Sequence, residues 1–206
     1  MMEMSGYYLP NKFVAVLLQA LDELMGTNGL HSLLNAASLK DWIQAPPAMD
    51  DKQEVDFSQF TRLSRTLEDL YGEKGSQSLM RRANKIAFQQ VWSLHPKLST
   101  AYEPEFQSLD LSTRVKRGLS AFAQALSESS DILADMKNGD PDFSFILERC
   151  PYCWNVTSEK PQCYAFYGLL ESALGLFAPD TSIEIIESTC IGTGEAACEF
   201  KLRLLT

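Results

Sequence analysis

The 206-residue sequence contains no apolar run that approaches the roughly 20 residues a membrane-spanning helix requires. It also starts without a basic segment followed by an apolar one, which is the pattern of a secretion signal. From these two absences we expect a cytoplasmic protein with no membrane insertion.

Positive charge is scarce, with 18 Lys and Arg residues against 27 Asp and Glu residues and a net charge of -9. Such a balance repels phosphate backbones and anionic lipid headgroups. There is also no helix-turn-helix pattern or ATPase motif. We therefore expect no direct binding to nucleic acid, and a sensing role would need a partner protein for its output.

Catalytic motifs are missing as well. The sequence has no P-loop and no G-x-S-x-G elbow, and His31 and His95 have no distinctive partners beside them, which favours surface or capping roles. The segment Gly192 to Ala197 formally fits a dinucleotide fingerprint, but it leads into an apparent strand rather than a helix. We interpret it as a hairpin turn and predict no catalytic residue.

What the sequence does contain is enough apolar character, 45% of its residues, to bury a core. Its first 130 residues follow helical spacing. A Pro- and Asp-rich loop is expected at 45–56, and serine caps are expected to open the later helices. The predicted helices are 11–25 with Gly26 as its C-cap, a short helix from Asn28, Ser58 to Tyr71 closed by Gly72, Ser76 to about Leu94 stopped by Pro96, and Ser112 to about Ser127.

The periodicity changes at Asp131. A hairpin is predicted around residues 138–141, a helix over 161–177 with Ser158 as its cap, and a second hairpin over 182–204. The fold class is therefore α+β, with N-terminal helices packed on a four-stranded, mainly antiparallel sheet of hairpin-helix-hairpin order. We expect a single domain over 1–206, helical in 1–130 and sheet-containing in 131–206.

Five cysteines is an odd number, and a reducing compartment makes structural disulfides improbable. If the helix 161–177 connects parallel strands at 142–150 and 182–190, the cysteines should gather at one end of the sheet. Thiolates beside a carboxylate suit Zn2+ better than calcium or magnesium. This predicts a structural zinc site built from Cys163, Cys190 and Cys198 with Glu187, although free cysteines are also common as small buried apolar residues.

The segment Cys150-Pro-Tyr-Cys153 allows three interpretations: a redox pair, a second half of the metal site, or two packed thiols near a strand end. A redox pair would be followed directly by a helix. The residues that follow, Trp154 to Val156, are instead typical of a loop, so redox catalysis ranks last of the three.

Two motifs, Cys163-x4-Gly168 and Glu187-x2-Cys190-x-Gly192-x-Gly194-x3-Cys198-x-Phe200, resemble the signature of the 4-vinyl reductase domain family. The resemblance covers about residues 131–206, and the N-terminal helical segment also looks like the lead-in of free-standing members. It implies an α+β fold shared with nitric-oxide sensors and trafficking-complex subunits, a homodimer, and a hydrophobic ligand. It also implies zinc ligation by Cys163, Glu187, Cys190 and Cys198.

The resemblance leaves three functional hypotheses. The first is a zinc-stabilised sensor or carrier of a hydrophobic, aromatic or tetrapyrrole-like small molecule, for which the aromatic candidates are Trp92, Trp154, Phe166 and Tyr167. Core packing explains these aromatic residues equally well. The second is a reductase or accessory subunit acting on the vinyl group of a bacteriochlorophyll precursor, and the third is a scaffold without a ligand.

Overall fold

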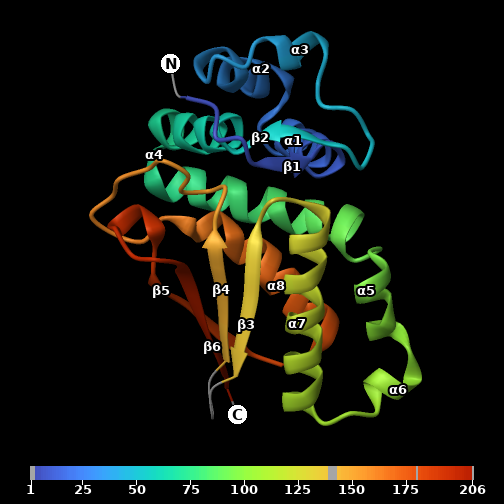
Figure 1. Cartoon of the computed structure of the whole chain (residues 1–206). Helices are drawn as coiled ribbons and strands as arrows, with labels where there is room; N and C mark the ends of the chain where they lie inside the picture. The colour runs from blue at the N-terminus through green and yellow to red at the C-terminus, as the bar shows by residue number, and fades with distance from the viewer. Residues whose placement is uncertain (1–2, 139–142, 180, 206) are drawn as a thin grey trace.

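The computed structural model describes residues 3–138, 143–179 and 181–205. Its N-terminal part consists of α1 (Asn11–Met25), α2 (Thr27–Ala36) and α3 (Asp41–Gln44), which lie on one side of the long helix α4 (Phe57–Ala87) (Figure 1). The apolar stripe of α1 is buried against α4, and α1 ends at Gly26, whose φ of 78° favours glycine. None of the described helices is long and apolar enough to span a membrane.

A small two-stranded sheet joins distant parts of the N-terminal segment. In it, β1 (Tyr8–Pro10) pairs antiparallel with β2 (Gln53–Asp56), and Leu9 lies opposite Val55. The prediction of a loop through residue 56 is therefore wrong at its end. Only one residue of β2 is apolar, so the strand depends on its distant partner and shows no periodicity of its own.

The predicted serine caps are also wrong. Helix α4 is capped by Asp56, which accepts a hydrogen bond from the Ser58 amide and forms a capping box with Gln59. Asp110 caps α7 (Leu111–Ser129) by accepting from the Thr113 amide. An aspartate that precedes each serine supplies the carboxylate that a cap needs, and the helices start there.

Ser76 opens no helix, because α4 continues through it after a break at Gly72, whose φ of 69° and ψ of 171° are not helical. A π-helical turn at Phe88–Trp92 follows α4 directly. Pro96 then opens a new short helix, α5 (Pro96–Ser99), and α6 (Pro104–Gln107) follows. The sequence analysis predicted neither α5 nor α6.

The C-terminal sheet contains β3 (Leu133–Asn138), β4 (Phe143–Arg149), β5 (Ile183–Thr189) and β6 (Cys198–Leu204), in the order β3-β4-β6-β5. All neighbouring strands are antiparallel, which confirms the predicted α+β class and four-stranded sheet. The strands β4 and β5 are parallel to each other, as predicted, with β6 between them. The tip of the predicted first hairpin, 139–141, lies outside the described residues.

Helices α7 and α8 (Phe166–Phe177) pack on one face of this sheet around buried phenylalanines. The ring of Phe166 lies 5.3–6.4 Å from those of Phe122, Phe145 and Phe200. The helix starts later than predicted because the Ser158 amide bonds to the Gly192 carbonyl and holds a loop. This places the end of β4, the start of α8 and the β5–β6 connection at one end of the sheet.

Candidate metal centre and the adjoining cleft

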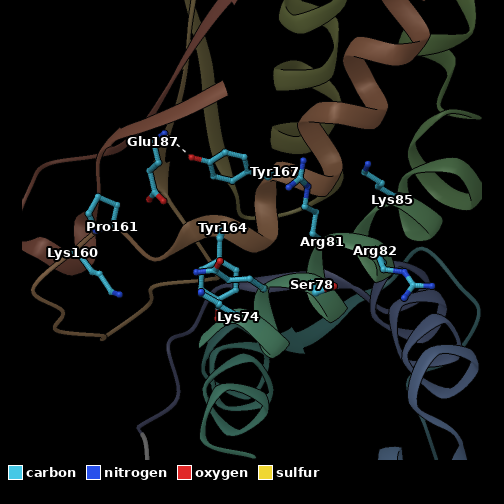
Figure 2. A pocket seen from close by; sticks show the side chains of 11 residues that line it. Lys74, Ser78, Arg81, Arg82, Lys85, Lys160, Pro161, Tyr164, Tyr167 and Glu187 are labelled. Carbon is cyan, nitrogen blue, oxygen red and sulfur yellow. Dashed lines mark hydrogen bonds between the residues drawn. The ribbon is translucent and has the colours of Figure 1, made fainter. Parts of the chain in front are cut away.

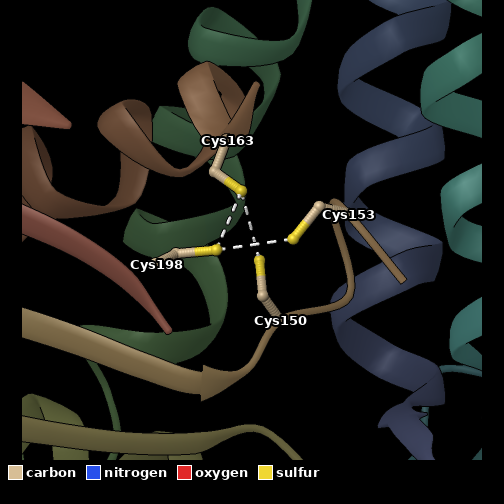
Figure 3. Close-up of side chains that lie close together, drawn as sticks. All are labelled: Cys150, Cys153, Cys163 and Cys198. Carbon is tan, nitrogen blue, oxygen red and sulfur yellow. Dashed lines mark hydrogen bonds between the residues drawn. The ribbon is translucent and has the colours of Figure 1, made fainter. Parts of the chain in front are cut away.

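All five cysteines meet at that end of the sheet, and all are buried and free of disulfides. Cys150 follows β4, Cys153 lies in the turn after it, Cys163 opens the 3-10 turn before α8, Cys190 follows β5, and Cys198 opens β6. Figure 3 shows Cys150, Cys153, Cys163 and Cys198 directing their sulfurs toward a common point.

The distances between sulfurs are those of thiolates around a single ion. Cys163 Sγ lies 3.8 Å from Cys190 Sγ and 3.5 Å from Cys198 Sγ, and the Cys190–Cys198 separation is 3.9 Å. A tetrahedral zinc ion with sulfurs at about 2.3 Å would separate them by about 3.8 Å. The cluster therefore has the dimensions of a mononuclear zinc site.

Two overlapping sets of four residues could hold the ion. One consists of Cys163, Glu187, Cys190 and Cys198, and the other of Cys150, Cys153, Cys163 and Cys198; within each set the ligand atoms lie within 4.8 Å of one another. The structure thus brings together the four residues predicted as ligands. It also adds Cys150 and Cys153, at 3.4 Å from Cys163 and Cys198 respectively.

The loop that carries Cys150 and Cys153 is fixed from α4. The Thr61 hydroxyl donates to the Pro151 carbonyl at 2.7 Å, and the Tyr152 hydroxyl donates to the Asn84 side chain at 2.8 Å. Because both bonds are buried, they hold the turn rigidly against the helix. The geometry places these two thiols in the cluster rather than in a redox motif at the start of a helix.

Without a cation the cluster holds its protons. Burial raises the pKa of the Cys150 thiol, and Cys150 together with the other thiols and burial raises the pKa of Cys163. The pKa of Cys190 is lowered because Cys153, Cys163 and Cys198 can donate hydrogen bonds to its sulfur. One thiolate is stabilised in this way, and a divalent cation would be needed to compensate for more.

Glu187 lies at the edge of the cluster. Its carboxylate accepts from the Cys163 amide at 3.0 Å, and its own amide donates to the Tyr167 hydroxyl at 2.8 Å. Burial, with the neighbouring Cys190 second, raises the pKa of Glu187 to about 8. A buried carboxylate of this kind is a ready partner for a metal ion.

A cleft of about 650 Å³ opens on the other side of Glu187, between α4, the start of α8 and the loop before it (Figure 2). Tyr164 and Tyr167 from the start of α8 and Pro161 from the loop contribute apolar surface. The remaining lining comes from polar and basic side chains: Lys74, Gln77, Ser78, Arg81, Arg82, Lys85 and Lys160. This volume lies within the range typical of small-molecule sites.

The four aromatic residues predicted to bind a ligand are distributed differently. Tyr167 lines the cleft. Phe166 is fully buried in the phenylalanine core, and Trp92 is buried beside Phe13 and Phe122. Trp154 packs its edge on Tyr7 near the N-terminus. Core packing accounts for the contacts of these three, and only Tyr167 adjoins both the cleft and Glu187.

The basic residues of the cleft were missed in the sequence. Their signal is local: Lys74, Ser78 and Arg82 follow one another at intervals of four, as do Gln77, Arg81 and Lys85, so all lie on one broad face of α4. Nothing in the sequence indicates that Lys160, 75 or more residues later, faces them.

Comparison with known proteins identifies part of the chain. Residues 143–204 match the model of the 4-vinyl reductase domain family, and this confirms the predicted resemblance over these residues. The match covers β4, α8, β5 and β6 and therefore every cysteine. No curated protein sequence matches the chain.

Solved structures show the fold over nearly the whole chain. A mutant H-NOX protein from S. oneidensis in the Fe(II) ligation state is 16% identical, with a TM-score of 0.63, covering 96% of this chain and 97% of its own. The same organism's H-NOX protein in the Fe(II)NO state is 14% identical, with a TM-score of 0.59 and coverages of 93% and 99%. A structure from a study of heme distortion in the H-NOX family is 13% identical, with a TM-score of 0.58 and coverages of 95% and 94%. The helical segment that precedes the matched domain thus belongs to the shared fold.

Proposed function

Given a 4-vinyl reductase domain over residues 143–204, we propose that the chain is a zinc-stabilised domain that binds a small molecule and serves as a sensor or carrier. The observation that carries the proposal is the gathering of five buried thiols and one carboxylate at the end of the sheet. Thiolates with an adjacent carboxylate select zinc over calcium and magnesium.

The zinc has a structural role in this proposal. Cys163, Glu187, Cys190 and Cys198 fill four tetrahedral positions, which leaves no position for a reactive water. These ligands come from β5, β6 and the turn before α8, so the ion would join three elements of the sheet end. The segment Gly192–Ala197 connects β5 to β6 within this site, so it serves the metal loop rather than a dinucleotide, and this disfavours the reductase alternative.

The proposed ligand is a hydrophobic or aromatic small molecule. A haem is a poor fit to this chain, because a protein haem takes a side chain such as histidine as its axial ligand. Both ring nitrogens of His95 are within hydrogen-bond distance of other groups, the Lys97 amide and the Ser129 hydroxyl, and its ring lies beside Trp92. The capping role predicted for His95 is confirmed, since it caps α5.

Metal analysis tests the zinc proposal. Protein purified without chelators should contain about one zinc per chain, and Cys198→Ser should lose nearly all of it, because Cys198 belongs to both candidate sets. The exposed Glu195 lies in the same loop and supplies the control, Glu195→Gln, which should retain zinc. Wild-type protein without zinc, or Cys198→Ser with a full complement, would refute the proposed site.

Native mass spectrometry of the same samples tests the rest of the proposal. A co-purified apolar molecule supports the binding function, and the mass of the assembly shows whether the chain forms the expected homodimer. Reduction of a vinyl substrate with an added electron donor would instead favour the reductase.

A further inference from the structure

The cleft beside the metal centre is strongly basic in an acidic protein. Five of the chain's 18 basic residues line it, and Glu187 is its one acidic lining residue among the described residues. The chain as a whole carries a net charge of -9. Like charges are costly to gather, so such a concentration creates a local positive potential that attracts anions.

Part of this positive charge is held in place from behind. Glu171 of α8 pairs with both Arg81 and Lys85, and Glu73 pairs with Lys160 at 2.5 Å. These carboxylates fix the cations that reach the cleft from two sides. Within the described part of the chain, no carboxylate lies at ion-pair distance from Lys74 or Arg82, so their charge is available to a ligand.

The wall opposite the α4 cations is aromatic and is held by hydrogen bonds. The Tyr164 hydroxyl lies 3.1 Å from the Ser76 hydroxyl, and the Tyr167 hydroxyl accepts from the Glu187 amide. Figure 2 shows the two rings on the side of the cleft that faces Arg81 and Lys74. Fixed rings across from cations suit a flat molecule with an apolar body and a negative group.

We propose that this cleft binds a small organic anion with a planar aromatic body, its carboxylate or phosphate meeting the cations of α4 and its ring lying against Tyr164 and Tyr167. The inference rests on the proposed ligand-binding function and gives that function a location and a ligand charge. Glu187 contacts both Tyr167 and the backbone of Cys163, so a molecule in the cleft lies one residue from the metal centre.

The test uses the zinc-containing full-length chain and three probes: 1-naphthoate, its uncharged analogue 1-naphthamide, and inorganic phosphate. Calorimetry should show 1-naphthoate binding at least about tenfold more tightly than either of the others, because charge-assisted hydrogen bonds exceed neutral ones by that much. Amide chemical-shift changes in NMR spectra should centre on α4 and the start of α8.

Two pairs of variants locate the binding. The double variant Lys74→Gln/Arg82→Gln should weaken 1-naphthoate about tenfold and leave 1-naphthamide unchanged, whereas Lys40→Gln/Lys116→Gln removes the same charge from exposed sites elsewhere and should leave both unchanged. Ser78→Trp should block the cleft to both probes, and Ser78→Ala should not. Failure of 1-naphthoate to bind, equal binding of all three probes, or identical losses in both double variants would overturn the proposal. Zinc measured in each sample keeps this result separate from the fate of the metal site.

Discussion

Cys163 and Cys198 belong to both possible ligand sets, so the identity of the zinc ligands depends on the residues that complete each set. The distances of Cys190 to these two, 3.8 and 3.9 Å, match the roughly 3.8 Å edge of a zinc–thiolate tetrahedron. Cys150 and Cys153 lie at 3.4 Å from their nearest partners, closer than that edge. The geometry therefore favours Glu187 and Cys190 as the completing pair.

Serine substitutions at the two contested positions distinguish the sets. Cys190→Ser should lower zinc affinity at least about tenfold, since a thiolate ligand is lost, whereas Cys150→Ser should keep stoichiometric zinc. A competition titration against a chromogenic chelator measures both. The opposite order, with zinc lost from Cys150→Ser and retained in Cys190→Ser, would assign the site to the four-cysteine set.

The convergence of the cysteines was predictable because a strand-helix-strand connection returns the chain to the same end of a sheet. The place of Cys150 and Cys153 was not, because the hydrogen bonds from Thr61 and Tyr152 that fix their turn join it to α4, at least 68 residues away. A sequence pattern shows what is near along the chain, and these contacts are distant along it.

Helices α4 and α8 touch at a glycine. A Cβ atom on Gly168 would lie 2.1 Å from the carbonyl oxygen of Arg81, a backbone atom that cannot rotate away. This gives a physical reason for the glycine in the Cys163-x4-Gly168 motif. The close approach also sets the spacing of the cleft, because Arg81 and Tyr167 line it from the two helices.

Gly168→Ala should therefore lower the free energy of unfolding by about 1–3 kcal/mol, the usual cost of overpacking. Gly175→Ala in the same helix is the control, because its Cβ would have no atom within 4 Å, and it should be neutral or stabilising by about 0.5–1 kcal/mol. Urea denaturation measures both. Equal stability of the two variants would mean that the helices can separate without cost.

The elements that could be predicted were those with their own periodicity, such as α1 and the alternating strand β6. The helix starts at Asp56 and Asp110 were misplaced because serine and aspartate are both good caps, and the choice between them depends on local geometry. The strand β2 has too few apolar residues to predict, since it forms only by pairing with β1, more than 40 residues earlier.

At the scale of the whole molecule, the metal centre joins the 4-vinyl reductase domain to the helices before it. Its ligands lie on β5, β6 and the turn that opens α8, while the neighbouring thiols Cys150 and Cys153 lie on a loop bonded to α4. An ion in this position would bind the folded chain and only weakly the unfolded one, so its binding energy adds to folding stability.

Removal of the metal should consequently lower the melting temperature. For an ion present at about a thousand times its dissociation constant, the stabilisation is about 4 kcal/mol, which corresponds to a fall on the order of 10 °C in a chain of this size. Calorimetry with and without a chelator, followed by return of Zn2+ or Mg2+, measures the effect. Only Zn2+ should restore the original melting temperature, because magnesium prefers oxygen ligands. Cys198→Ser should melt at the lower temperature under all three conditions. A wild-type protein that contains zinc yet melts unchanged after its removal would show that the buried thiols pack well enough to hold the sheet end without an ion.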